Sequence, residues 1–267
     1  MPELPEVETI VRALKGNIGA QIENFEIIRQ DMIRQEEFAP EKLKGKTIYN
    51  IRRRGKFLVF ELDADLYLVF HLGMSGRFFM VSGVQETDKH IHAKIHLNND
   101  TLLIFRDPRR FGGIWFICDI EKFFRHLGKE PLAEEFTSSY LKEILSNRKA
   151  PVKNLLLNQN LISGIGNIYA DEALFAAGIR PDRSAASLNQ DEIEKLHHAI
   201  RQVLHQGIEF RGTTFRDYRD AFNESGNFQN HLKVYGRYNQ PCLICNNPIQ
   251  RLRIGGRSSH FCNNCQH

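Results

Sequence analysis

The sequence predicts an α+β protein in which a β-rich N-terminal domain follows one helix and precedes a helical domain and a small cysteine-containing segment. Three observations support this prediction. Short aromatic and β-branched runs separated by turn residues fill residues 47–118. Apolar residues recur at helical spacing between residues 141 and 207. Two Cys-x-x-Cys pairs lie near the C-terminus. Several short strands at this spacing indicate a sandwich or a barrel.

The first element is a helix that begins at Pro5 and ends near Gly16. Its apolar residues lie at i, i+3, i+4 and i+7, which places them on one face: they are Val7, Ile10, Val11 and Leu14. The strands expected after it are residues 57–62, 67–72, 78–81, 91–97, 101–105 and 114–117. Residues 127–136 read as a linker, and further helices are expected at 141–145, 151–157, 168–177 and 193–207.

The composition is that of an ordinary globular protein. With 42% hydrophobic and 25% charged residues among 267, the chain is neither disordered nor fibrous, and its length suffices for about two domains. No apolar stretch approaches the ~18 residues that span a bilayer. Glu3, Glu6 and Glu8 stand where a signal peptide would carry positive charge, so we expect a cytoplasmic protein without a membrane partner. In that compartment, five cysteines indicate metal binding or chemistry before disulfides.

The distribution of charge is more informative than its sum, 36 − 32 = +4. No acidic residue follows Glu224, whereas five basic residues do. Two further clusters are Arg52 to Lys56 and Arg106 to Arg110. Any one cluster could be a solvated surface. Three acid-poor clusters together indicate a phosphate-rich partner, because Lys and Arg gain binding free energy when they replace condensed counterions.

The cysteine spacing predicts one structural zinc ion. Cys242 and Cys245 form one pair, and Cys262 and Cys265 form the other after 16 intervening residues. Each pair can supply two thiolates to a tetrahedral ion. Two redox dithiols are the alternative. Between the pairs, a Gly255-Gly256 turn would present Arg257 to a ligand. The fifth cysteine, Cys118, is expected to be a buried thiol in a strand.

The N-terminus offers a chemical reagent. Removal of Met1 before the small residue Pro2 would leave a secondary amine, which condenses with aldehyde-level carbons to give an iminium ion. Such an amine titrates near 7.7–8.0, so a neutral fraction exists at cellular pH. Glu3 and Glu6 are carboxylates close enough in sequence for proton transfer. An ordinary Pro-rich helix start is the alternative reading.

Eight motifs in order now carry a resemblance over essentially the whole chain. They are MPELPEVET at 1–9, RGK at 54–56, HLGMSG at 71–76, DPRRFG at 107–112, GIGNIYA at 164–170, GTT at 212–214, VYGR at 234–237, and the four cysteines around Gly-Gly-Arg. In these the chain resembles the bacterial formamidopyrimidine-DNA glycosylases, or 8-oxoguanine DNA glycosylases. The resemblance implies an N-terminal β-sandwich catalytic domain with a leading helix (1–130), a helix–two-turn–helix DNA-binding domain (131–225) and a zinc-finger hairpin (226–267).

The resemblance also implies catalytic roles in base excision repair. Pro2 corresponds to the nucleophile that attacks C1′ of the damaged nucleotide, and Glu3 to the proton donor to the sugar ring or in the base-release step. Lys56 corresponds to the lysine of β-elimination and Arg257 to the arginine of δ-elimination. The implied activity is removal of 8-oxoguanine and formamidopyrimidines from duplex DNA by a monomer, followed by cleavage at the abasic site.

DNA contacts are implied in the same way. Asn167 and Arg257 correspond to residues that hold the backbone around a flipped nucleotide. His90, Arg109 and Arg148 fall at DNA-binding positions, although some members have lysine where this chain has Arg148. Met74, Arg109 and Phe111 correspond to the side chains that fill the space left by the extruded base. Core packing is the alternative for Met74 and Phe111.

Two rival functions remain at this point. A sister family that removes oxidised pyrimidines shares Pro2 and Glu3, but the start of the chain and the Arg109 and Phe111 pair favour purine lesions. A non-catalytic, zinc-dependent sensor of distorted DNA would explain the basic clusters and the cysteines. Such a sensor would not explain why the chain begins with Pro2 and Glu3 at the start of a helix and also contains Lys56. Lesion recognition is expected to involve the polar loop at 216–229.

Overall fold

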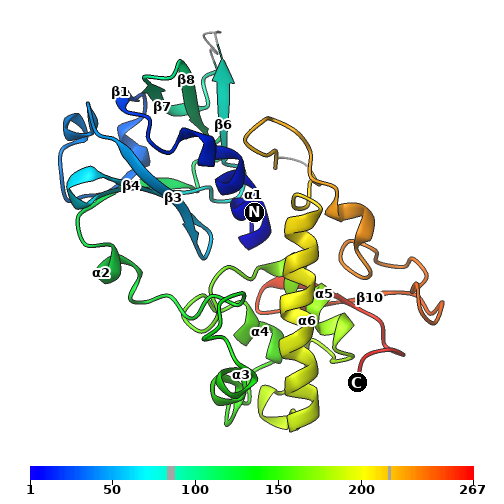
Figure 1. Cartoon of the computed structure of the whole chain (residues 1–267). Helices are drawn as coiled ribbons and strands as arrows, with labels where there is room; N and C mark the ends of the chain where they lie inside the picture. Colours follow the sequence, from blue (N-terminus) through cyan, green and yellow to red (C-terminus); the bar gives the residue numbers. More distant parts are fainter. Residues whose placement is uncertain (83–87, 216–217) are drawn as a thin grey trace. The chain divides into compact units, whose positions relative to one another are not determined.

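The computed structural model describes residues 1–82, 88–215 and 218–267, which form two compact units. The first contains Met1–His126 together with Ile208–Gln229. The second contains Leu127–Gly207 and Asn230–His267. The sequence of elements is drawn in Figure 1. The three-part domain division expected from the sequence stays a prediction. No helix among the described residues combines the length and apolarity that a bilayer crossing requires.

The leading helix α1 spans Leu4–Leu14 and confirms the expected N-terminal helix. Pro5 suits the first turn because its missing N–H would have no partner there. Glu3 and Glu6 form a capping box: each side chain accepts the backbone N–H of the other residue, which satisfies donors that the first turn leaves open. The apolar face, with Val7, Ile10 and Leu14, is fully buried.

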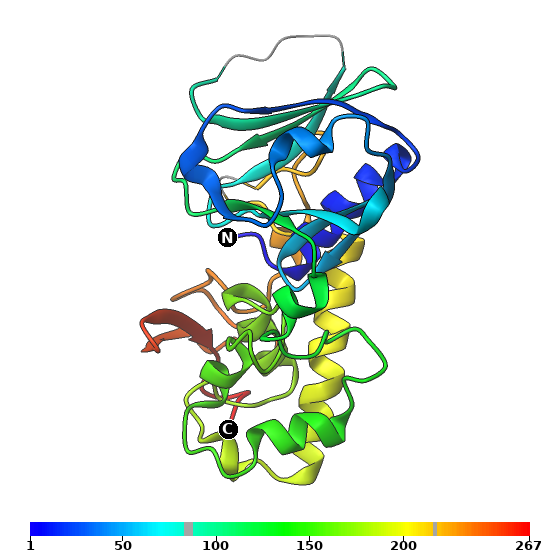
Figure 2. The same cartoon turned by 90° about the vertical axis from the view of Figure 1, so that its left-hand side faces the viewer.

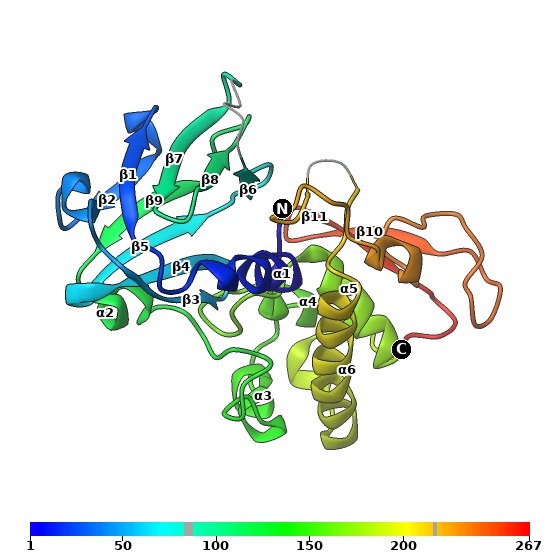
Figure 3. The same ribbon diagram turned by 45° about the horizontal axis from the view of Figure 1, so that its top comes forward.

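Two sheets form the sandwich of the first unit (Figures 2 and 3). In the described residues, one has the strand order β1-β7-β8-β6 and the other β2-β9-β5-β4-β3. The bounds are β1 Ile22–Ile27, β2 Ile33–Glu36, β3 Ile48–Arg54, β4 Phe57–Leu62, β5 Leu66–His71, β6 Arg77–Ser82, β7 Ile91–Leu97, β8 Thr101–Arg106 and β9 Gly113–Ile117. Among the described strands of these two sheets, β2 and β9 pair in parallel and the other pairs are antiparallel.

Aromatic rings join the two sheets. Phe70 of β5 lies 4.8 Å from Phe78 of β6 and 5.4 Å from Phe105 of β8, measured between ring centroids. Buried rings at such tilted or edge-on angles add to the stability gained by burying their area. This contact between sheets confirms the sandwich over the barrel.

The six expected strands correspond to β4–β9, each within about two residues of its predicted bounds. Three strands of the first unit, β1, β2 and β3, were not predicted as separate strands. In β2 only Ile33 is apolar and the other three residues are exposed, so no alternation identifies it. Residues 208–229 complete the first unit: Tyr218 and Ala221 lie in its core, and the Ala221 carbonyl accepts the N–H of Met80.

The second unit is helical. Its helices are α3 Ser138–Leu145, α4 Val152–Leu156, α5 Asn167–Ala176 and α6 Gln190–Glu209, which runs into the first unit at its last two residues. Asn189 caps the start of α6, since its Oδ1 accepts the N–H of Glu192. The hairpin of β10 Gln250–Ile254 and β11 Arg257–Phe261 lies with β11 beside α5 (Figure 3).

Candidate active site and DNA-binding surfaces

Pro2 and Glu3 are buried at the start of α1. The Glu6 carboxylate accepts the Glu3 N–H at 2.8 Å with one oxygen and the Thr213 N–H at 2.7 Å with the other. Glu6 therefore has a structural role, because both of its oxygens accept backbone donors, and its part in proton transfer stays a prediction. Glu3 remains the carboxylate next to Pro2.

Lys56 lies in the turn between β3 and β4, where Gly55 has a left-handed φ of 57°. Only 5% of the lysine is exposed. Its charge acts on His71: burial first and Lys56 second lower the pKa of His71 to about 4. The imidazole is consequently neutral at pH 7, and its Nδ1 accepts the N–H of Gly73 at 3.1 Å.

Met74 and Phe111 are exposed by 43% and 56%, each on a loop of the first unit. Core packing, the alternative considered from the sequence, is excluded for both. The Arg109 guanidinium carbon lies 4.8 Å from the Phe111 ring centroid, a cation–π contact. The structure thus brings two members of the expected gap-filling trio, Arg109 and Phe111, into direct contact.

Asp107 joins the two loops, and sequence reasoning did not identify this role. One carboxylate oxygen accepts the Ser75 hydroxyl at 2.6 Å and the Arg109 N–H at 3.3 Å. The other accepts the Gly112 N–H at 2.8 Å. Asp107 is fully buried, so loss of these bonds would leave a buried charge unsatisfied.

Gly73 is required for the close approach of the same loops. Its φ of +60° suits glycine, and a Cβ would lie 2.4 Å from Gly112 N and 2.5 Å from the Phe111 carbonyl carbon. The backbone beside Met74 and the backbone beside Phe111 are therefore in van der Waals contact.

In the second unit, Asn167 lies beside the hairpin that carries Arg257. Asn167 is the first residue of α5, and its Nδ2 donates to the Ser258 carbonyl at 3.0 Å. Gly255 and Gly256 both have positive φ, as a two-residue hairpin turn requires. Arg257 follows this turn and is exposed. The structure thus places Asn167 and the expected δ-elimination arginine on adjoining segments.

A buried ion pair between α4 and α5 binds the β10–β11 hairpin. This pair was not predicted from the sequence. Lys153 of α4 lies 2.6 Å from Asp171 of α5, and neither side chain is exposed. Lys153 Nζ also donates to Ser259 Oγ at 2.7 Å, and the His260 N–H donates to Asp171 at 2.8 Å. Both charges therefore fix residues of β11.

Glu172 fixes the segment before the zinc finger. Its carboxylate accepts three consecutive backbone N–H groups, of Lys233, Val234 and Tyr235, at 2.8–3.0 Å. Burial raises the pKa of Glu172, and the three donors oppose that shift. The VYGR motif thus owes its position to a carboxylate on α5.

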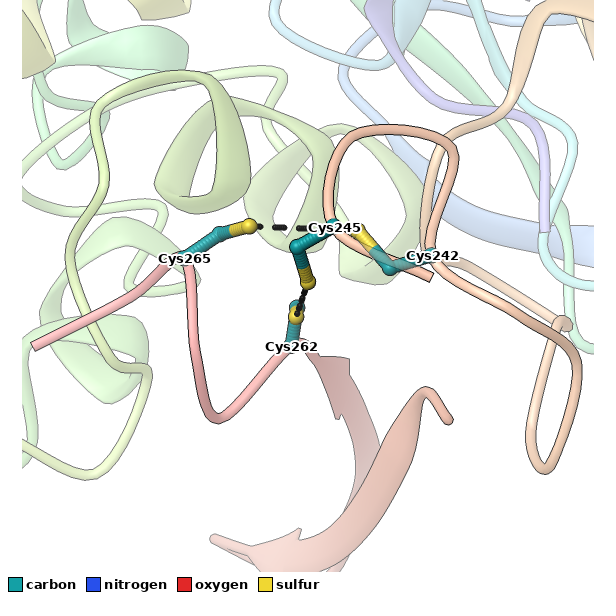
Figure 4. Close-up of side chains that lie close together, drawn as sticks. All are labelled: Cys242, Cys245, Cys262 and Cys265. Atoms are coloured by element: carbon teal, nitrogen blue, oxygen red, sulfur yellow. Dashed lines mark hydrogen bonds between the residues drawn. The ribbon is translucent and has the colours of Figure 1, made fainter. Parts of the chain in front are cut away.

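The four cysteines converge as a metal site (Figure 4). Their sulfurs lie within 4.8 Å of one another, at 3.9 Å for Cys242–Cys265 and 3.4 Å for Cys245–Cys262. Tetrahedral Zn–S bonds of about 2.3 Å place sulfurs about 3.8 Å apart, so the cluster fits zinc. The Asn247 N–H is the main cause that lowers the pKa of Cys245 to about 6. The predicted structural zinc site is confirmed.

The remaining predicted residues are placed as follows. His90 is half-buried, and its carbonyl accepts the Asp107 N–H. Arg148 is exposed in the loop between α3 and α4. Cys118 corrects an expectation: it is exposed at the end of β9, because the sheet ends there. Of the expected lesion-recognition loop, residues 216 and 217 lie outside the described part of the chain.

Comparison with known proteins agrees with this geometry. Residues 1–114 match the formamidopyrimidine-DNA glycosylase N-terminal domain, 127–219 the helix–two-turn–helix domain of the same enzymes, and 239–267 the zinc finger found in FPG and IleRS. The formamidopyrimidine-DNA glycosylase of Syntrophomonas wolfei is 55% identical, and that of Rickettsia africae 44% identical, with full coverage of both chains.

Solved structures match equally well. A variant of Lactococcus lactis FPG in complex with Fapy-dG-containing DNA has a TM-score of 0.93 at 36% identity over 100% of both chains. The Thermus thermophilus MutM (FPG) protein has a TM-score of 0.89 at 39% identity, covering 99% of this chain and 98% of that one. The set of three domains defines a zinc-finger DNA glycosylase. The chain belongs to the formamidopyrimidine-DNA glycosylase family.

Proposed function

We propose that this protein removes oxidised purines, 8-oxoguanine opposite cytosine and formamidopyrimidines, from duplex DNA and then cleaves the abasic strand. The observation that carries the proposal is the Pro2-Glu3 pair at the buried start of α1 in a member of this family. The Lactococcus lactis relative in complex with Fapy-dG-containing DNA supports the substrate class. We also propose that it acts as a monomer on nucleoid DNA in the cytoplasm.

In the first step, the Pro2 amine, freed by removal of Met1, attacks C1′ of the extruded nucleotide. The C1′–base bond breaks, and its electron pair leaves with the base, which takes up the proton that the Pro2 nitrogen loses on forming its bond to C1′. Glu3, adjacent in the chain, donates a proton to the deoxyribose ring oxygen, and the ring opens to an iminium ion. No oxidant or reductant enters this step.

In the second step, the iminium accepts the electron pair left when C2′ loses a proton, and the C3′–O bond breaks to release the 3′ phosphate. We assign Lys56 to this β-elimination. A second elimination releases the 5′ phosphate, and we assign Arg257 to it. Hydrolysis then frees Pro2.

The DNA must be opened before this chemistry, because C1′ cannot be attacked within a stacked duplex. We propose that Met74 and Phe111 fill the vacated space while Arg109 hydrogen-bonds the orphaned cytosine. Asn167, Arg148 and His90 would contact backbone phosphates. Zinc, held by the four cysteines, would fix the fold of the hairpin that carries Arg257.

Oxidised pyrimidines are the second candidate substrates. The Lactococcus lactis protein has also been solved with oxidised-pyrimidine-containing DNA, at 36% identity to this chain. Duplexes with a single 8-oxoguanine, formamidopyrimidine or dihydrouracil, assayed side by side, separate the two classes by their single-turnover rates. We expect the purine lesions to be cleaved faster.

The mechanism is tested by borohydride, which reduces the iminium to a stable amine. We expect a covalent enzyme–DNA adduct whose mass places the DNA on Pro2. An N-terminal extension that converts Pro2 into an amide should abolish both trapping and strand cleavage, and Pro2→Gly should reduce them. Unchanged cleavage in the extended protein would move the nucleophile elsewhere, whereas binding without cleavage by the unaltered enzyme would favour the non-catalytic sensor.

A further inference from the structure

We infer that Arg34 is a positioning residue that holds Phe111 in the conformation in which it enters the DNA stack. The inference rests on the gap-filling role proposed above for Phe111. Arg34 lies on β2, a strand with no other part in the site, and nothing in its sequence surroundings suggests a function. Three of its side-chain hydrogen bonds go to the carbonyls of Arg110 and Gly112, which flank Phe111, and its Nη1 donates to the Asp31 carbonyl at 3.2 Å.

The strand pairing directs the Arg34 side chain toward this loop. In the parallel pair of β2 and β9, Ile33 lies opposite Ile114 and Gln35 opposite Trp115, and the register is irregular between them, at Arg34. Such irregularities turn a side chain out of the regular alternation. Gly113 leaves room for it: a Cβ there would lie 2.4 Å from Arg34 Cγ. The arginine stem therefore passes directly over Gly113.

The guanidinium then binds the carbonyls on both sides of Phe111. Nη2 donates to the Gly112 carbonyl at 2.8 Å and to the Arg110 carbonyl at 3.2 Å. Nε donates to the Gly112 carbonyl at 3.2 Å. Nη2 and Nε therefore make three bonds to these two oxygens from one planar group, and a lysine ammonium, whose donors all lie on a single atom, does not reproduce this pattern.

The backbone held in this way is strained. Arg110 has φ of +55°, a left-handed conformation that a residue with a Cβ adopts only where its surroundings impose it. Arg34 bonds its carbonyl, and Asp31, at the N-terminal end of the same segment, forms an ion pair with its side chain at 2.8 Å. The segment 31–34 thus holds the turn that presents Phe111.

Asp107 alone does not restrain this turn. Asp107 accepts the Gly112 N–H, whereas Arg34 donates to the Gly112 carbonyl. The two side chains therefore fix the two peptide groups on either side of the Gly112 Cα. Such restraint favours DNA binding by an exposed wedge such as Phe111. Its orientation is already set in the free protein, so ordering the side chain does not reduce the binding free energy. Loss of Arg34 should leave Phe111 present but no longer oriented.

The test compares Arg34→Ala, Arg34→Lys and the matched control Arg29→Ala. Arg29 carries the same charge as Arg34 and, like Arg110, forms an ion pair with Asp31, at 3.0 Å. The structure shows no hydrogen bond from Arg29 to residues 110–112. Each change is made in the wild-type and the Phe111→Ala background. Excision of 8-oxoguanine is measured in single turnover, base unstacking by 2-aminopurine beside the lesion, and folding by thermal unfolding.

We expect Arg34→Ala to slow both unstacking and excision about tenfold, Arg34→Lys to give a smaller loss, and Arg29→Ala to stay within about twofold of wild type. In the Phe111→Ala background, Arg34→Ala should add less than about twofold, since there is no wedge to orient. A tenfold effect in both backgrounds, or no effect of Phe111→Ala itself, would overturn the inference. Absence of 8-oxoguanine excision by the unaltered enzyme would instead refute the proposed function.

Discussion

Glu6 accepts the backbone N–H of Thr213 at 2.7 Å, although 207 positions separate the two residues. The other oxygen of the same carboxylate accepts the Glu3 N–H. Gly212 makes this approach possible, because its φ is +81° and a Cβ would lie 2.9 Å from Glu6 Cγ. One buried side chain thereby binds the start of α1 to the segment that leads into residues 218–229.

Replacement of Glu6 by glutamine should therefore destabilise the first unit. The amide keeps one acceptor but directs an NH2 group at a backbone donor, and an unsatisfied buried group costs about 1–3 kcal/mol. We expect a loss of that size in the free energy of unfolding measured with urea. Glu23→Gln is the control, since Glu23 is exposed on the same unit. Equal stabilities of the two variants would contradict the role of Glu6.

His71 should make stability depend on pH. Its pKa is about 4 when folded and 6.5 when unfolded, so the unfolded state binds more protons between these values. Stability attributable to a neutral His71 is thus present above pH 6.5 and is lost as pH falls toward 4, by up to about 3 kcal/mol.

Urea unfolding at pH 7, 6, 5 and 4.5 measures this effect. His71→Gln should flatten the dependence over this range, whereas the exposed His126→Gln should leave it as in the wild type. A His71→Gln curve parallel to the wild type would show that another group is responsible.

Breaking the Lys153–Asp171 pair from one side should be more damaging than removing both charges. Asp171→Asn leaves the Lys153 ammonium fully buried without its counter-ion, which costs about 3–5 kcal/mol. Lys153→Met combined with Asp171→Asn removes that charge and should recover part of the loss. Thermal unfolding of the zinc-loaded protein gives the comparison.

An exposed pair serves as the control. Asp191 and Lys195 on α6 are 71% and 61% exposed, and Asp191→Asn should cost about 0–1 kcal/mol. A double variant less stable than Asp171→Asn alone would contradict this prediction. It would show that the pair stabilises the fold through the packing of its side chains and not through its charges.

Loss of zinc should weaken DNA binding without unfolding the first unit. We expect Cys245→Ser, or a strong chelator, to reduce affinity for lesion-containing duplex at least about tenfold in fluorescence anisotropy, because the zinc supplies the folding free energy of the hairpin that carries Arg257. The single tryptophan, Trp115 in β9, reports the first unit independently. Cys118→Ser should change neither signal. Normal affinity in metal-free protein would argue against this role for the finger.

The sequence predicted features whose signal is local. Strands β4–β9 carry aromatic and β-branched runs, and the zinc ligands and Pro2-Glu3 are recognised by spacing or position. The contacts that orient the site join distant residues: Arg34 meets Gly112 across 78 positions, and Glu6 meets Thr213 across 207. Tertiary packing creates these pairs, and no periodicity encodes them. Cys118 was misjudged for a related reason, because the apolar run before it does not show where the sheet ends.

The return of residues 208–229 to the first unit has a consequence for biosynthesis. A ribosome delivers the chain from its N-terminus, and domains usually fold as they emerge. Here the opening sandwich lacks Tyr218 and Ala221 until most of the polypeptide has been translated. The core of the N-terminal unit is therefore completed only after residues 208–229 have been synthesised. A truncated product that stops before residue 208 would expose an incomplete core to proteases.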